Sequence, residues 1–234
     1  MKYHEPFDWE GVLAWLAARA IPGIERIEGD AYIRGDVRVW REGDEVCTTG
    51  EEARVRRLFD LDFDPAPMHA ALGRDRMLAP LLRKRPGIRV PGAWDPFELA
   101  VRAIVGQQVS VAGARTILGR IASEHGLDPH VLADVTVGGM PRKRAETIQH
   151  VARFFAEGGE PAIDALLELP GIGPWTANYI AMRLGDRDAF PAGDLILRRN
   201  AGGLTERELL KKAERWRPYR AYAAVLLWTR TPSA

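Results

Sequence analysis

The fold of this chain is decided by a short stretch in its last third, Leu169-Pro170-Gly171-Ile172-Gly173-Pro174-Trp175-Thr176-Ala177-Asn178-Tyr179. Two glycines flank one apolar residue, so the backbone can turn sharply and approach another surface without interference from a Cβ atom. We expect Ile172 to insert into the core and Pro174 to begin a second helix, whose first N–H groups point outward. Such a helix start binds anions, and on DNA the anion is a phosphate. A bare Pro-Gly-Ile-Gly is more often an ordinary turn between helices, so the rest of the chain has to support this interpretation.

The composition is that of an ordinary globular protein, and it excludes several classes. The 234 residues include one cysteine, Cys47, which rules out a disulfide framework, a CxxC zinc site and a cysteine-ligated iron–sulfur cluster. The first residues lack the basic start and apolar run of a signal peptide, and no apolar stretch approaches the roughly 18 residues of a membrane span. We therefore expect a cytoplasmic protein without a membrane segment.

The net charge of +1 does not by itself indicate a nucleic-acid partner. Arginine and lysine do gather in local clusters that could neutralise phosphates, for example Arg142–Arg144 and Arg198–Arg199. Each cluster taken alone is more often the solvated face of a surface helix. Charge therefore leaves the question of DNA binding open.

Local patterns predict a mainly α protein with a small mixed start. Helical periodicity and Gly-Asp turn signals predict one helix and four short strands at the N-terminus: Trp9–Ala20, Ile24–Ile27, Ala31–Ile33, Val37–Trp40 and Glu45–Thr48. Beyond Gly50, capping signals and helical periodicity predict helices at Glu51–Phe59, Met68–Gly73, Arg74–Arg85, Asp95–Gly106, Val111–His125, Pro141–Ala156, Pro161–Glu168, Pro174–Leu184, Asp194–Asn200, Glu206–Trp216 and Arg220–Thr229. Asp95 with Glu98, and Thr205 with Glu208, are placed to form capping boxes.

The hairpin stretch resembles the helix-hairpin-helix motif of the DNA glycosylase superfamily, and the likeness continues beyond it. Further matching segments are Phe97–Ser110, Gly139–Pro141, Lys143–Ala145, Phe190–Arg199 and Trp216–Trp228. Together they resemble 3-methyladenine DNA glycosylase II, the AlkA type, over nearly the whole chain. The resemblance implies a mainly α fold of two helical lobes with a small α/β N-terminal subdomain. It implies a subdomain at 1–50, a discontinuous lobe at 51–91 and 189–234, and a lobe at 92–188 that carries the motif at about 161–184.

The resemblance also implies a catalytic carboxylate. In the superfamily a short loop after the hairpin ends in an aspartate that opens the next helix, and Asp194 fits that place. Asp194 is equally suited to cap the helix, and capping would hold its carboxylate in place. A fixed carboxylate in a dry pocket can stabilise the oxocarbenium-like state that forms as a glycosidic bond breaks.

The hairpin helix lacks the nucleophile of the glycosylases that also nick the backbone. Those enzymes carry a lysine there, and this chain has Trp175 two positions after the second glycine. The single cysteine excludes the four-cysteine cluster of other branches. The enzyme therefore looks monofunctional and cofactor-free. Backbone carbonyls of such a hairpin can hold a monovalent cation on DNA, and the residue types do not test this.

Four aromatic residues match positions that line the base pocket in this family: Trp15, Trp175, Tyr179 and Trp228. A cationic alkylated purine gains roughly 0.5–2 kcal/mol over an electron-rich ring face. Each ring could also be an ordinary core residue.

The resemblance assigns DNA contacts to two loops. These are the hairpin, with Gly171, Ile172, Gly173 and Thr176, and the loop with Gln107 and Gln108. At the position of Gln108 the family has an apolar residue that wedges into the gap left by the flipped base. Gly193 stands where the family often has a second acid. The loop that ends in Asp194 would match the family one residue later if the alignment were fixed on Leu195–Ile196. The N-terminal sheet also looks shortened, which suggests a more open pocket.

The function expected is a glycosylase that flips alkylated, 3-methyladenine-like bases out of double-stranded DNA as a monomer and hydrolyses the N-glycosidic bond in base excision repair. One alternative is a non-catalytic helix-hairpin-helix DNA-binding protein, which would need neither Asp194 nor the tryptophans. A second is a glycosylase for deaminated or oxidised bases, whose recognition usually requires more hydrogen-bonding groups in the pocket.

Overall fold

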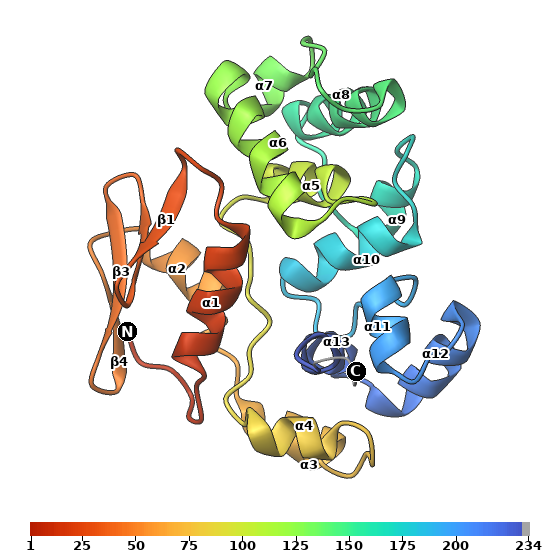
Figure 1. The fold of residues 1–234 in the computed structure, drawn as a ribbon. Coiled ribbons are helices and arrows are strands. Elements are labelled where there is room, and N and C mark those ends of the chain that lie inside the picture. Colours follow the sequence, from red (N-terminus) through yellow and green to blue (C-terminus); the bar gives the residue numbers. More distant parts are fainter. Residues whose placement is uncertain (231–234) are drawn as a thin grey trace.

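The computed structural model describes residues 1–230, as one helix, a small sheet and then a series of helices (Figure 1). The N-terminal elements are α1 (Trp9–Arg19), β1 (Glu25–Glu28), β2 (Ala31–Arg34), β3 (Val37–Glu42) and β4 (Glu45–Thr48). The helices that follow are α2 (Glu52–Phe59), α3 (Pro65–Leu72), α4 (Ala79–Lys84), α5 (Pro96–Val105), α6 (Val111–His125), α7 (Pro129–Leu132), α8 (Arg142–Ala156), α9 (Ile163–Leu167), α10 (Pro174–Arg183), α11 (Leu195–Asn200), α12 (Glu206–Ala213), the 3₁₀ turn η1 (Glu214–Trp216) and α13 (Arg220–Trp228). The described residues are mainly helical, as the sequence predicts.

The four strands form an antiparallel sheet in chain order. Each hairpin turns at one of the predicted Gly-Asp pairs, where the φ angles of Gly29, Gly35 and Gly43 are 61°, 54° and 62°. Glycine adopts this left-handed region without the steric cost that a Cβ atom brings. Alternate residues on the inner face are fully buried and pack against α1 and α2, namely Tyr32, Val39 and Val46.

The apolar core is divided into three clusters. One joins the sheet to α1 and α2, and a second fills the space among α5 to α10. The third joins α3 and α4 to α11–α13, so the two helices after α2 pack on the C-terminal ones. We propose that these clusters correspond to the subdomain and the two lobes expected from the sequence, except that α2, expected in the lobe at 51–91, packs with the sheet. Figure 1 shows α10 between the two groups of helices, and its Tyr179 packs against both helical clusters.

Several predicted helices differ at their starts. The third begins at Pro65 rather than Met68, because Asp64 caps it by accepting the Ala66 N–H. The helix predicted from Arg74 begins only at Ala79, because the Asp75 side chain accepts the next two free N–H groups and holds residues 75–78 as a turn. The short helix α7 was not predicted, although Asp128 caps it.

One of the two predicted capping boxes is absent. Thr205 and Glu208 form theirs as expected. Asp95 caps α5 by accepting the Glu98 N–H at 2.8 Å, but Glu98 does not return a bond to the cap. Its carboxylate instead pairs with Arg34 and Arg102, because two guanidinium groups attract a buried carboxylate more strongly than one backbone N–H does.

Within the described part of the chain, no helix combines the length and apolar character that a bilayer-spanning segment needs.

Candidate active site

The hairpin between α9 and α10 is held by its central isoleucine. Ile172 is 6% exposed and belongs to the cluster among α5 to α10, which confirms that it inserts into the core. Gly171 has a φ of +87°, and a Cβ atom there would lie 2.0 Å from the Thr147 hydroxyl of α8. Both observations require glycine at this position. The turn is therefore locked against α8 from one side and by Ile172 from the other.

The start of α10 is open to a partner. Gly173 is its N-cap, no side chain caps it, and nothing lies within 4 Å of where a Gly173 Cβ atom would stand. Among the described residues, the backbone N–H groups of Trp175 and Thr176 have no hydrogen-bond acceptor. The free donors and the helix dipole together make this end attractive to an anion.

The glutamine loop is tied to the hairpin. The Gln107 side-chain amide donates to the Thr176 hydroxyl at 3.0 Å, and Arg144 of α8 donates to the Gln107 carbonyl at 2.8 Å. The Thr176 side chain is buried and occupied by this bond, and its backbone N–H has no acceptor among the described residues. Gln108 is exposed, with a φ of +56° that is uncommon for a residue other than glycine. The structure thus presents Gln108 at the surface, one residue beyond an anchored neighbour.

Asp194 is fixed by three donors. Its Oδ1 accepts the Leu197 N–H at 2.9 Å, so it caps α11. The same oxygen accepts the indole N–H of Trp228 at 3.2 Å, and Oδ2 accepts that of Trp175 at 3.2 Å. The carboxylate therefore lies between two tryptophans that are far apart in the sequence.

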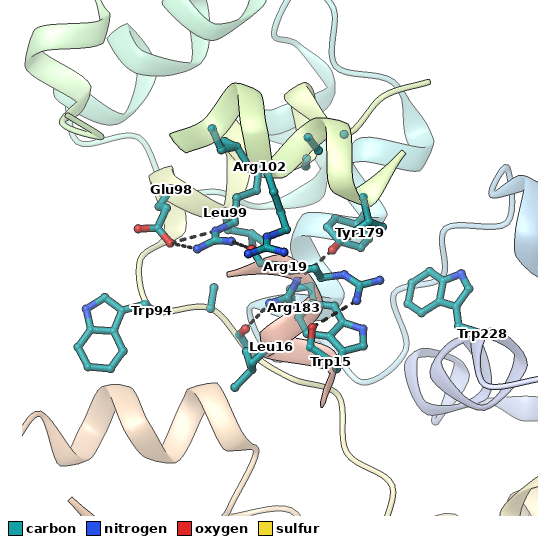
Figure 2. Close-up of a pocket in the computed structure, with 18 of the residues that line it drawn as sticks. Trp15, Leu16, Arg19, Trp94, Glu98, Leu99, Arg102, Tyr179, Arg183 and Trp228 are labelled. Carbon is teal, nitrogen blue, oxygen red and sulfur yellow. Dashed lines mark hydrogen bonds and ion pairs between the residues drawn. The ribbon is translucent and has the colours of Figure 1, made fainter. Parts of the chain in front are cut away.

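A cavity of about 380 Å³ opens beside this carboxylate, within the range of roughly 300–1,000 Å³ that is common for ligand sites. All four predicted aromatics and Asp194 line it, and Figure 2 shows Trp15, Tyr179 and Trp228 around it. The Trp175 and Tyr179 rings stack with centroids 5.4 Å apart and planes inclined by 13°. Trp228 meets Tyr179 edge-on at 6.2 Å. The structure thus brings the expected site residues together.

Four arginines also line the cavity, and the sequence analysis did not single out any of them: Arg19, Arg102, Arg115 and Arg183. The guanidinium groups of Arg19 and Arg183 lie over the Trp15 ring, 4.0 and 4.1 Å from its centroid (Figure 2). Arg183 is buried and donates to the Tyr179 hydroxyl at 3.0 Å. Arg19 and Arg183 each follow an aromatic residue by four positions, Arg19 after Trp15 and Arg183 after Tyr179, which places each pair on one helix face. This spacing is the sequence feature that could have indicated these two arginines.

Burial lowers the pKa of Arg183 to about 10, and the neighbouring charge of Arg19 adds to this while Tyr179 opposes it. The guanidinium still carries its proton at neutral pH. Its other donors reach the carbonyls of Pro91 and Gly92. Among the described residues, the hydrogen bonds of this buried cation therefore go to carbonyls and a hydroxyl rather than to a carboxylate.

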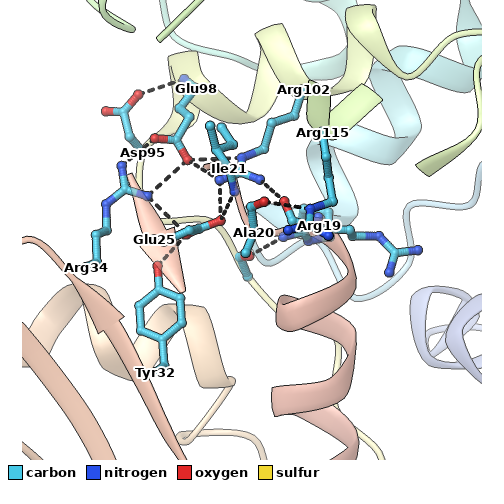
Figure 3. A network of polar contacts seen from close by, with 12 residues as sticks. Arg19, Ala20, Ile21, Glu25, Tyr32, Arg34, Asp95, Glu98, Arg102 and Arg115 are labelled. Carbon is cyan, nitrogen blue, oxygen red and sulfur yellow. Dashed lines mark hydrogen bonds and ion pairs between the residues drawn. The ribbon is translucent and has the colours of Figure 1, made fainter. Parts of the chain in front are cut away.

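A buried ion cluster joins the sheet to α5 at one wall of the cavity (Figure 3). Arg102 donates to Glu25 at 2.6 Å and to Glu98 at 2.8 Å, and Arg34 pairs with both carboxylates. The Tyr32 hydroxyl donates to Glu25 as well. Burial alone would raise the pKa of Glu98, but Arg102 and Arg34 lower it. The cluster pins α5, one wall of the cavity, to the N-terminal sheet.

Comparison with known proteins gives the class of this fold. A 3-methyladenine DNA glycosylase from Archaeoglobus fulgidus superposes with a TM-score of 0.82 at 20% identity, covering 97% of this chain and 96% of that one. The Schizosaccharomyces pombe 3-methyladenine DNA glycosylase Mag1, in complex with abasic DNA, superposes with a TM-score of 0.62 at 22% identity, covering 72% of this chain and 99% of that one. The fold and the hairpin are those of the helix-hairpin-helix DNA glycosylases.

The sequence comparisons give the family. Residues 1–47 and 43–95 match the AlkA N-terminal domain. DNA-3-methyladenine glycosylase 2 of Escherichia coli is 34% identical over 97% of this chain and 95% of its own length. The chain therefore belongs to the AlkA-type 3-methyladenine DNA glycosylase II family, whose members remove alkylated bases in base excision repair. A probable bifunctional transcriptional activator/DNA repair enzyme AlkA of Mycobacterium tuberculosis is 38% identical over 96% of this chain, which spans about half (55%) of that longer relative.

Proposed function

We propose that this chain is a monofunctional DNA glycosylase that extrudes alkylated, 3-methyladenine-like bases from duplex DNA and hydrolyses the N-glycosidic bond. The observation that carries the proposal is the Asp194 carboxylate, held by the indole N–H groups of Trp175 and Trp228 at the wall of an aromatic cavity. The family relationship and the activities after which the relatives are named agree with it.

The proposed chemistry needs one fixed negative charge. As the bond between C1′ and the base nitrogen breaks, its electron pair leaves with the base and positive charge grows on the sugar. Asp194 stabilises that charge and orients the water that attacks C1′, and the water's proton passes to the carboxylate or to solvent. A cationic base departs as a neutral molecule and needs little help from an acid. The hairpin helix offers no lysine, so no covalent step is required.

The aromatic walls supply binding energy for the extruded base. Stacking on an aromatic ring contributes about 1–3 kcal/mol, and a cationic ring gains roughly 0.5–2 kcal/mol more. Extrusion costs a few kcal/mol and costs least for a poorly paired base. Trp175 has both roles, because its indole N–H holds Asp194 while its ring stacks beside Tyr179.

The DNA-binding surface is proposed from the same elements. Gly173 and the free N–H groups of Trp175 and Thr176 would bind a backbone phosphate, while Gly171 and Ile172 hold the turn in shape. Gln108 would fill the gap left by the flipped nucleotide. The partner is double-stranded DNA with damaged bases, and one chain would act on one lesion as a monomer. We place this activity in the cytoplasm, where bacterial repair enzymes meet DNA.

The test is release of bases from methylated duplex DNA by the native chain, Asp194→Asn and a control, Asp128→Asn. Asparagine can keep the helix cap at both positions, and Asp128 caps the remote helix α7. We expect Asp194→Asn to lose about a hundredfold or more in rate with DNA binding intact, and the control to match the native chain. Equal release by the native chain and Asp194→Asn would remove Asp194 from the mechanism. DNA binding without release by the native chain would favour a binding module.

A further inference from the structure

Two exposed aliphatic side chains lie at the mouth of the cavity. Val111 and Ile196 line it, and yet they are 44% and 45% exposed. The leucines that line the same cavity are buried, at most 4% exposed: Leu16, Leu58, Leu99 and Leu118. A side chain that belongs to the cavity wall and is also open to solvent lies where the cavity meets the surface. We call Val111, at the start of α6, and Ile196, at the start of α11, the aliphatic rim.

The exposure of the rim calls for a partner. Leu195, next to Ile196, is 53% exposed as well, so apolar surface continues outward from the cavity at the start of α11. The other large apolar side chains that are exposed in the described chain lie on separate helices, α7, α9 and α12: Val131, Leu167 and Leu210. Scattered apolar residues of that kind are ordinary, whereas apolar surface gathered at one site marks a place where something binds. Because the rim is continuous with the cavity, its partner is the ligand that enters the cavity.

The part of an extruded nucleotide that remains at the mouth is its sugar. The base enters the aromatic part of the cavity, and the phosphates stay in the DNA backbone outside. Asp194 acts on C1′ of the sugar, and Ile196 follows Asp194 by two residues, in the first turn of the helix that Asp194 caps. Deoxyribose has no hydroxyl at C2′, so it presents hydrocarbon to its surroundings there. An aliphatic rim is suited to such a surface and not to a charged phosphate.

We infer that Val111 and Ile196 are positioning residues that pack against the deoxyribose of the extruded nucleotide and keep bulk water away from Asp194. The inference rests on the proposed function and adds two residues to the same site. A carboxylate stabilises a growing positive charge more strongly when the surrounding water is excluded. The rim therefore acts through Asp194, which remains the group that acts on C1′, and the rim itself takes no part in proton transfer.

The binding test uses two base-free analogues in the same duplex, a tetrahydrofuran abasic site and a propanediol spacer. Both leave the same gap in the base stack, but only tetrahydrofuran keeps the sugar ring. Threonine and valine have the same shape, so Ile196→Thr against Ile196→Val, and Val111→Thr against the native chain, isolate the effect of an added hydroxyl. The control is Val131→Thr on α7, where the native valine is 42% exposed, nearly as much as Val111.

We expect Ile196→Thr and Val111→Thr to raise the Kd for the tetrahydrofuran duplex by roughly threefold to thirtyfold and that for the spacer duplex by less than about twofold, because a hydroxyl without a partner is unfavourable beside the sugar. Ile196→Val and Val131→Thr should change neither Kd. Since the substituted side chains are exposed, all variants should unfold in urea like the native chain. An equal loss on both analogues would place the rim in the base stack and overturn the inference, as would equal binding of the two analogues by the native chain.

Base release tests the second part of the inference. Under single-turnover conditions on methylated duplex DNA, we expect Ile196→Thr to release bases roughly threefold to thirtyfold more slowly and Ile196→Val to stay within about twofold of the native rate. An unchanged rate for Ile196→Thr would show that the rim does not assist Asp194 and would overturn the inference. If the native chain releases no base at all, the proposed function fails, whereas the two analogues still decide whether the rim holds the sugar.

Discussion

Replacing Gly173 by alanine should separate DNA binding from folding stability. Gly173 has φ −103° and ψ 175°, which any residue adopts, and a Cβ atom there meets nothing within 4 Å. We therefore expect the free energy of unfolding to change by no more than about 0.5 kcal/mol. The new methyl group would instead stand at the open start of α10 and obstruct a phosphate. Losing one or two charge-assisted hydrogen bonds costs about 1.5–3 kcal/mol, or roughly a tenfold to hundredfold rise in Kd.

Gly171→Ala is the matched comparison, two residues earlier in the same turn. Its φ of +87° is unfavourable for alanine, and the Cβ atom would lie 2.0 Å from Oγ1 and 2.9 Å from Cγ2 of Thr147. The left-handed conformation costs about 1–2 kcal/mol and the overpacking about 1–3 kcal/mol. We expect Gly171→Ala to lower the free energy of unfolding by roughly 2–5 kcal/mol.

Urea unfolding gives the stabilities, and fluorescence anisotropy with an undamaged duplex at one fixed salt concentration gives the affinities. An undamaged duplex isolates the phosphate contact from the base pocket. The reasoning is refuted if Gly173→Ala destabilises the fold as much as Gly171→Ala does, or if it leaves Kd unchanged.

Three further predictions concern Asp194, Glu98 and Asp60. Trp228→Phe removes the indole donor 3.2 Å from Asp194, so single-turnover release should fall roughly tenfold to a hundredfold, while an unchanged rate would show that this bond does not matter. Glu98→Gln removes a buried carboxylate from the ion cluster and should lower the free energy of unfolding, measured in urea, by about 3–5 kcal/mol. An unchanged free energy, as expected for an ion pair exposed at the surface, would contradict this. Burial raises the pKa of Asp60 to about 6, so its contribution to stability is largest below about pH 4 and is lost as the pH rises through 6. Asp60→Asn should therefore stabilise the chain at pH 8 but not at pH 4, and a pH-independent effect in urea titrations would contradict this assignment.

Features that depend on hydrogen bonds within three or four residues could be predicted from the sequence. The Gly-Asp pairs mark all three hairpin turns, and Thr205 caps its helix as expected. Asp194 has the same local character, since its cap to Leu197 is visible in the residue types. The hairpin and its buried isoleucine follow from the same short-range chemistry.

The tertiary structure alone decided which distant groups meet. Glu98 has the spacing of a capping box, yet packing brings Arg34 from 64 residues away and takes the carboxylate into the ion cluster. The indole of Trp228 reaches Asp194 across 34 positions of the chain, and Arg19 of the first helix meets Arg183 of α10 over the Trp15 ring. A local pattern records only the bonds that a segment can make with itself. Which charges share a cavity depends on how the segments pack, because desolvation and Coulomb energy act through space rather than along the sequence.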